Sequence, residues 1–234
     1  MSFYVNNTEL QQINFNGNAV NSAYFNNVLI WNSFNWVGWN NATWEDIYNL
    51  CKAKQEGKIS AWPSDVVVGA TKITTLSTAV LGSSSFTMRL IGIDEDGDGL
   101  LTFESSTTTV DGVNYNDISP IYYYGNLADI HSYCDAKNYT KTVSKVFTYP
   151  GGLSDKTYSC NMWILSVDEL GAGGGGAYSY YASGANSLRK KNAAYWTRTA
   201  NNDTLDAYSI STTGALTQTN NLTETPIAPA FVIG

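Results

Sequence analysis

The sequence predicts an α+β protein in which many short antiparallel strands outnumber two helices. Apolar residues recur with helical spacing in only two segments, while most others alternate with polar residues or form short runs. Clusters rich in Gly, Asn, Ser and Thr separate these runs. Strands of this length joined by turns favour antiparallel pairing, with the helices packed on the sheet.

The first 31 residues contain a repeated pattern of alternation followed by a turn pair. The pairs are Asn6-Asn7, Asn16-Gly17 and Asn26-Asn27, and such pairs are typical of tight hairpin turns. We therefore expect a small β-meander. Because a few short strands are rarely stable alone, residues 1–35 are interpreted as an attachment segment and residues 36–234 as the main domain.

A helix is predicted from Trp44 onward. Trp44, Ile47 and Cys51 have the spacing of one helical face. Thr43 is a good N-cap, and Gly57 is suited to follow the last turn.

A second helix is predicted over residues 127–136. Leu127, Ile130 and Cys134 would share its buried face, and Asn126 would cap it. Alternating or apolar runs predict the strands. These are expected at 66–68, 86–93, 100–104, 162–167, 195–199, 207–211 and 228–233.

Two segments are expected to be long loops. Residues 171–176 are nearly all glycine, and residues 200–225 are rich in Asn, Thr, Ser and Asp around a hairpin at Thr213-Gly214. Long polar loops within a well-patterned domain are usually functional or disordered.

Composition favours a binding protein with a polar, weakly charged surface. Only 14% of residues are charged, and Tyr, Ser, Gly and Asn are the residues that binding loops use. The net charge of −7 disfavours nucleic acid, and no segment has the apolar length that spans a membrane. No secretory signal is visible. The short basic run Arg189-Lys190-Lys191 is interpreted as a solvated turn.

The residues that usually carry catalysis are sparse. Cys51, Cys134 and Cys160 lie too far apart for a disulfide framework or paired zinc ligands, so we expect them to be reduced and buried. His131 is the single histidine and is interpreted as an ordinary helix-surface residue. These observations favour a protein that is not an enzyme and needs no cofactor.

The acidic segment from Asp94 to Gly99 matches the first half of a calcium loop. Ser105 stands where a bidentate Glu is expected, and apolar strands rather than helices flank the segment. A hairpin turn is the better interpretation, and no metal site is predicted.

The tryptophans allow two interpretations. Large aromatic side chains such as Trp44, Trp62, Trp163 and Trp196 are typical core anchors. An exposed set would instead form a platform for stacking sugars. We favour the core.

Four short motifs occur in order along the main domain: 162–166 (MWILS), 169–171 (ELG), 195–198 (YWTR) and 229–233 (PAFVI). With these motifs, residues 36–234 resemble the C-type-lectin-fold variable proteins of diversity-generating retroelements. Similar segments occur in phage tail-tip proteins. The N-terminal hairpins look like the adaptor segments of phage tail proteins.

The resemblance implies a C-type-lectin-like domain that displays a diversified receptor-binding surface. In that family adenine-directed mutagenesis rewrites a region near the C-terminus, here about residues 178–225, and adenine-rich Asn codons are its targets. Trp196, Arg198 and the 228–233 strand look like fixed scaffold. The implied ligand-binding residues are Tyr195, Asn201, Asn202, Asp203, Asp206, Tyr208, Ser209, Ser211, Asn220 and Asn221.

Strand alternation refines this set. Asp206 and Tyr208 would share a face with Ile210, and Ser209 would lie on the opposite face with Ser211. Tyr208, with Tyr195 beside it, would be the aromatic anchor of the surface.

The resemblance also implies partners and a location. These are a host cell-surface protein or glycan as ligand, virion tail proteins bound through the N-terminal segment, and a virion tail made in the host cytoplasm. We expect no nucleic acid and no membrane insertion, and homo-oligomerisation stays open.

Two other functions stay open. One is a structural tail or surface protein without a diversified site. The other is an enzyme similar to formylglycine-generating enzymes, which share the fold and need a reactive cysteine pair near the C-terminus. Only Cys160 follows Cys134 here, and the Glu-Pro-Asn cluster of calcium-dependent lectins is absent.

Overall fold

The structure is a computed structural model that describes residues 4–5, 8–9, 13–15, 18–20, 22–25, 28–32, 34–115 and 121–234, with backbone alone for residues before 34 and for 121–124. The chain divides into two compact units, Met1–Val66 and Val67–Gly234, and each is described by itself. This division groups the first helix with the N-terminal hairpins. The expected limit of an attachment segment at residue 35 stays a prediction.

The N-terminal strands form three separate hairpins. They are β1 (Tyr4–Val5) with β2 (Thr8–Glu9), β3 (Ile13–Phe15) with β4 (Asn18–Val20), and β5 (Ser22–Phe25) with β6 (Val28–Asn32). Each pair is its own two-stranded sheet, so the expectation of one continuous meander is wrong for the described residues. Local turns pair adjacent strands but do not join one hairpin to the next. The Asn-Asn and Asn-Gly turn pairs lie outside the described residues.

Helix α1 (Trp44–Gln55) confirms the prediction from caps and periodicity. The Thr43 hydroxyl accepts a bond from the Asp46 amide at 3.2 Å, and the Asp46 carboxylate accepts one from the Thr43 amide at 2.8 Å. This capping box satisfies two amides that a helix start leaves unpaired. Gly57 has φ +68° just after the helix, a conformation that glycine adopts without strain.

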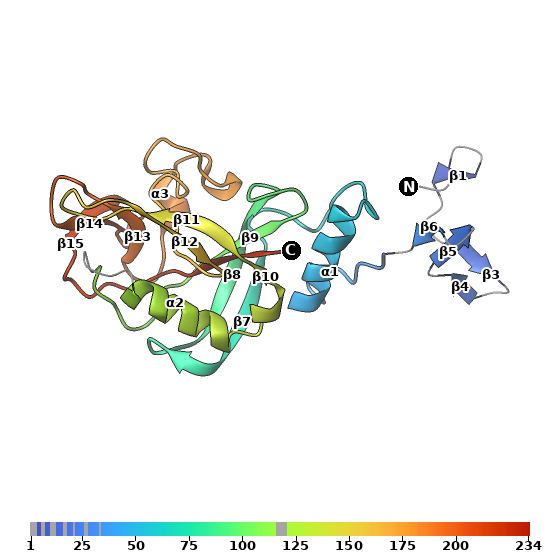
Figure 1. Ribbon diagram of the computed structural model, residues 1–234, viewed down its shortest axis with the longest axis horizontal. Coiled ribbons are helices and arrows are strands. Elements are labelled where there is room, and N and C mark those ends of the chain that lie inside the picture. The colour runs from blue at the N-terminus through green and yellow to red at the C-terminus, as the bar shows by residue number, and fades with distance from the viewer. Residues whose placement is uncertain are drawn as a thin grey trace. The chain divides into compact units, whose positions relative to one another are not determined.

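A curled five-stranded antiparallel sheet forms the centre of the second unit (Figure 1). Its strands, in spatial order, are β10 (Thr140–Lys141), β16 (Ala230–Ile233), β9 (Leu101–Ser105), β8 (Ser83–Ile93) and β7 (Thr71–Val80). The last strand of the chain lies inside the sheet, and all four of its residues are buried. The C-terminal strand is therefore part of the core rather than an appendage.

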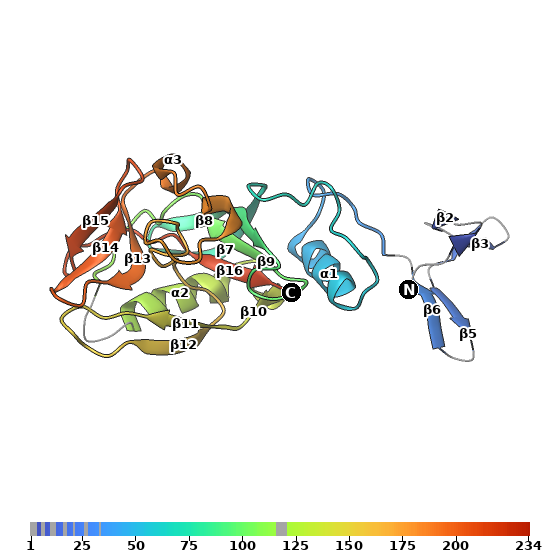
Figure 2. The same cartoon turned by 90° about the horizontal axis from the view of Figure 1, so that it is seen from above.

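Helix α2 (Ile121–Tyr133) lies near β7 and buries Leu127 and Ile130 (Figure 2). It begins and ends earlier than the predicted 127–136, and Asn126 is inside the helix rather than at its cap. The Cys134 amide still donates to the Ile130 carbonyl, but the Asp135 amide donates to the Thr75 carbonyl at 3.0 Å, and Cys134 forms a β-bridge with Leu76. Pairing with the edge strand β7 therefore follows the last helical turn.

A second group of strands covers the rest of the unit. The hairpin of β11 (Val143–Phe147) and β12 (Lys156–Cys160) is one part, and the sheet of β13 (Tyr195–Ala200), β14 (Asp206–Ile210) and β15 (Leu216–Asn220) is the other. Short helices η1 (Lys137–Tyr139), η2 (Ser179–Tyr181) and α3 (Asn186–Arg189) connect the strands. Gly214, at φ +82°, makes the predicted turn between β14 and β15.

The structure confirms the α+β class and five of the seven predicted strands, namely those at 86–93, 100–104, 195–199, 207–211 and 228–233. The strand predicted at 66–68 is a turn region, and 162–167 makes only one bridge, between Trp163 and Ala230. A short apolar run can be buried without pairing, which periodicity does not reveal. Strands β7, β10, β11, β12 and β15 were not predicted.

The core confirms the interpretation of three tryptophans as anchors. Trp163 and Trp196 are fully buried, and Trp44 is nearly so in the first unit. Trp62 is half-buried. In the second unit, Trp163 and Tyr195 belong to a cluster of buried side chains that joins the two groups of strands.

Candidate functional site

Three loops meet at one end of the β13–β14–β15 sheet. The Gly151 amide of the β11–β12 loop donates to the Thr204 carbonyl at 2.8 Å, and the Asn221 amide after β15 donates to the Leu205 carbonyl at 3.3 Å. The β13–β14 loop thus lies between the other two. We call this region the rim: loop residues 201–205 together with the strand pairs Asp206/Asn220 and Tyr208/Gln218.

The strand pairs of the rim lie on one face of the sheet. Asp206 is opposite Asn220 and Tyr208 is opposite Gln218 in the antiparallel register, so these four side chains point the same way. Ile210 follows on the same face but is buried, as strand alternation predicts. The face therefore runs from the core at Ile210 to solvent at Asn220.

The rim loop is held by hydrogen bonds between its own side chains and backbone amides. The Asn201 amide side-chain oxygen accepts from the Asp203 amide at 3.0 Å, and the Thr204 hydroxyl accepts from the Asp206 amide at 3.2 Å. Such local bonds fix a turn without help from neighbouring side chains. The side chains of Asn202 and Asp203 are exposed on this fixed loop.

Three of the ten predicted ligand-binding residues are buried. Tyr195 is 1% exposed and donates its hydroxyl to the Arg189 carbonyl at 2.9 Å. Ser209 is 2% exposed and lies within 2.8 Å of the Thr217 hydroxyl, and Asn221 is 4% exposed. Tyr195 is buried because β13 is covered on both faces, so the expectation that it lies beside Tyr208 on an open surface is wrong.

The other seven predicted residues lie in two places, the turn that follows β14 and the rim. Ser211 is in the turn at the opposite end of β14, where its hydroxyl is 2.9 Å from that of Thr213. The remaining six are exposed or half-buried and are brought together in the rim. They are Asn201, Asn202, Asp203, Asp206, Tyr208 and Asn220.

Beneath the rim, β13 forms a rigid support. Arg198 is paired with Glu169 and donates to the Ile164 carbonyl at 3.1 Å, while the Trp196 indole donates to the Val113 carbonyl at 2.7 Å. Burial acts to raise the Glu169 pKa, but the hydrogen bond and charge of Arg198, the charge of Lys145 and the Ser166 amide together outweigh it and hold the pKa below its usual value. Trp196 and Arg198 therefore have the buried positions expected of scaffold.

The structure also shows two buried lysine clusters that the sequence did not predict. Lys145 lies between Asp96 and Glu169, and Lys191 is paired with Glu104 at 3.0 Å. Arg189 is buried as well, so the interpretation of the run Arg189-Lys190-Lys191 as a solvated turn holds only for Lys190. The one local signal was a lysine within an apolar strand pattern, at Lys145.

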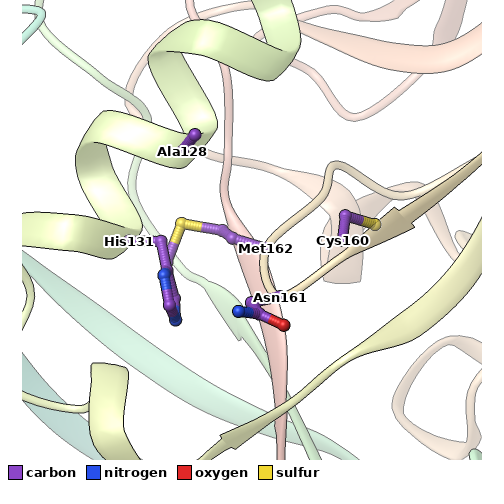
Figure 3. A pocket seen from close by; sticks show the side chains of 5 residues that line it. All are labelled: Ala128, His131, Cys160, Asn161 and Met162. Atoms are coloured by element: carbon purple, nitrogen blue, oxygen red, sulfur yellow. The ribbon is translucent and has the colours of Figure 1, made fainter.

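A small cavity of about 90 Å³ adjoins α2 (Figure 3). His131 lines it, with a ring nitrogen 2.7 Å from the Thr140 hydroxyl, and burial lowers its pKa. The Cys160 sulfur points away from His131 in Figure 3 and lies 3.7 Å from the Val143 carbonyl. Burial raises the pKa of this thiol to about 11, so a neutral thiol without an imidazole partner is a poor nucleophile.

The acidic segment at Asp94 is the turn between β8 and β9, as predicted. Asp94 accepts from the Gly99 amide at 2.8 Å, and Asp96 is paired with Lys145. Within the part of the chain that the structure describes, no group of three or more His, Cys, Asp or Glu side chains is placed to hold a metal ion. All three cysteines are free and buried, as expected.

In the comparisons with known proteins, one family model matches part of the chain. A family model described as a domain of unknown function, DUF6273, matches residues 130–234. This span contains the rim, β13 and β16. No curated protein and no solved structure matches the chain. In the described residues, no helix is long and apolar enough to cross a membrane.

Proposed function

We propose that this chain is a phage or prophage tail-tip receptor-binding protein that presents the rim to a host-surface protein or glycan on a C-type-lectin-like domain. Residues 1–35 would attach it to the virion tail. The ligand-binding residues are narrowed to the six that meet in the rim. The chain acts as a binding module and not as an enzyme.

One observation supports the proposal. The side chains that stabilise the fold are different from those that face solvent in the rim. The segment from 201 to 225 is bracketed by β13 and β16, both buried, while the rim side chains are exposed or half-buried and, apart from Leu205, polar. A region held at both ends by a fixed core tolerates changes at its exposed positions, since such substitutions usually alter stability little. This is the property that a diversified binding surface needs.

The rim also has the chemistry of a binding surface. Tyr208 supplies a half-buried aromatic ring, and Asn202, Gln218 and Asn220 supply amides that adapt their hydrogen bonds. Aromatic residues often dominate the free energy of such interfaces, and polar neighbours tune the fit.

The alternative functions have less support. A structural tail protein without a diversified site would need no exposed polar cluster on a bracketed segment. The formylglycine-generating type of enzyme needs two cysteines that react together, yet Cys160 lines the cavity of His131 while Cys134 forms a bridge with Leu76.

Binding to cells tests the proposal. Fluorescently labelled protein would be applied to bacteria related to the source strain, and the bound fraction measured by flow cytometry. We expect Tyr208→Ala or Asp203→Ala to reduce or redirect binding at an unchanged melting temperature. The matched control is Thr78→Ala, an exposed position on β7 outside the rim. Equal effects of rim and control variants would contradict the assignment of the rim.

A genomic observation tests the diversification. The neighbourhood of the gene should encode a reverse transcriptase and contain a near-copy of the 3′ part of the gene that differs at adenines. If the rim binds cells but the gene has no such neighbours, the result would support the receptor-binding function and exclude diversification of the rim.

A further inference from the structure

A lysine and two carboxylates from three separate segments converge inside the second unit. Lys145 is on β11, Asp96 is in the turn between β8 and β9, and Glu169 follows the Trp163 segment. The Lys145 Nζ atom is 3.0 Å from Asp96 Oδ1 and 3.1 Å from Glu169 Oε1. One amine therefore touches one oxygen of each acid.

The amine is largely removed from water. Lys145 is 8% exposed, and its Nζ atom lies 4.4 Å from the centre of the Trp163 ring and 3.1 Å from the Tyr178 hydroxyl. The Trp163 ring face and the Tyr178 hydroxyl therefore hold the amine beside the two carboxylates and away from bulk water.

The other oxygen of Asp96 is held by two donors. The Tyr178 hydroxyl and the Thr102 hydroxyl each donate to Asp96 Oδ2 at 2.7 Å. The amine lies at Oδ1 instead, so the two oxygens of this carboxyl have different surroundings. Paired donors on one carbonyl oxygen are the arrangement that stabilises negative charge when a nucleophile attacks the carbon.

We propose that Lys145 and Asp96 join through an intramolecular amide bond, with Glu169 as the group that transfers the protons. The bond would cross-link β11 to the β8–β9 turn of the five-stranded sheet. None of its residues belongs to the rim, and the cross-link does not depend on the proposed function.

The reaction is a condensation without a redox step. Glu169 accepts a proton from the Lys145 ammonium, and the neutral amine attacks Cγ of Asp96, whose Oδ2 is stabilised by Tyr178 and Thr102. Two of the three ammonium protons reach Oδ1, one directly and one through Glu169. The Cγ–Oδ1 bond then breaks and Oδ1 leaves as water. The third proton stays on the amide nitrogen, and Glu169 regains its starting state.

The second buried lysine provides an internal comparison. Lys191 is 3.0 Å from Glu104 Oε2, an oxygen that also accepts the Tyr181 hydroxyl. In the described part of the chain, this pair has no second carboxylate to transfer protons, and Glu104 Oε1 has no hydrogen-bond partner. We therefore expect Lys191 to remain an ion pair while Lys145 reacts.

Intact mass spectrometry of the denatured full-length chain tests the proposal. We expect a mass lower than that of the sequence by one water molecule. Trypsin should release peptide 90–137 joined to peptide 142–156, without cleavage after Lys145. A succinimide at Asp96-Gly97 would lose the same water, but it would leave the two peptides separate.

The variants distinguish these outcomes. Lys145→Arg keeps the charge and should restore the full mass, and Tyr178→Phe should slow formation by about 10²- to 10³-fold and leave an unlinked fraction in fresh protein. Lys191→Arg is the matched control and should remain cross-linked. A wild-type chain at full mass after prolonged incubation in the folded state would overturn the proposal. Loss of water that persists in Lys145→Arg would also overturn it.

Discussion

Strand β13 and the rim are neighbours in one sheet but have opposite physical characters. Almost every side chain of β13 is buried, and its polar members bond to backbone groups of other segments, as Arg198 does with Ile164 and Trp196 with Val113. The rim loop bonds mainly within itself, through Asn201 and Thr204.

The difference shows how one sheet separates stability from recognition. Long-range buried contacts make β13 sensitive to substitution, because a lost partner leaves a cavity or an unpaired polar group. One hydrogen bond between the two regions is accepted by a backbone group of the rim: the Thr197 hydroxyl donates to the Tyr208 carbonyl at 2.9 Å. A backbone link is independent of the side chain at position 208.

The largest effect is expected at Trp196. Replacing Trp196 by Ala should lower the free energy of unfolding by about 3–5 kcal/mol, because it removes a fully buried ring and its bond to Val113. Urea unfolding would measure the change. A loss below about 1 kcal/mol would mean that β13 does not support the fold.

Breaking the buried ion pair of Arg198 and Glu169 should lower the free energy of unfolding nearly as much. Arg198→Met leaves Glu169 as a largely buried carboxylate without its closest partner, and we expect a loss of about 3–5 kcal/mol. The double variant with Glu169→Gln removes both charges and should recover part of this loss. Equal stability of the single and double variants would show that the pair is not coupled.

Acid should weaken the same pair. The Glu169 pKa in the folded chain is held below its ordinary value of 4.5, since Arg198, Lys145 and the Ser166 amide together outweigh the effect of burial. The unfolded chain therefore binds more protons, and the stability from this group is present above pH 4.5 and lost as pH falls through the folded pKa.

Thermal unfolding between pH 6 and pH 3 would measure this loss. Glu169→Gln should show a weaker dependence on pH than the wild-type chain. An identical slope in both proteins would assign the acid sensitivity to other groups.

The smallest effect on stability is expected in the rim. Asn202→Ala, Asp203→Ala and Tyr208→Ala should change the free energy of unfolding by about 0.5 kcal/mol or less, because these side chains are exposed or half-buried. Tyr195→Ala serves as the contrast, since Tyr195 is buried in the core. Similar losses for Tyr195 and Tyr208 would remove the distinction between scaffold and rim.

The sequence by itself determined the features that depend on nearby residues. The N-cap of α1 at Thr43, the turn from Asp94 to Gly99 and the turn at Gly214 were predicted because each is set by a few adjacent side chains and by glycine's freedom at positive φ. Alternation likewise placed Asp206 and Tyr208 on the face of Ile210.

Tertiary structure alone decided what is buried and what is brought together. Tyr195 and Lys191 have the residue types of a surface, yet other segments cover both. Lys145, Asp96 and Glu169 are far apart in the sequence, and they meet only because β11, the β8–β9 turn and the segment after Trp163 pack together. Local periodicity carries no record of such long-range packing, since many partners satisfy the same apolar pattern.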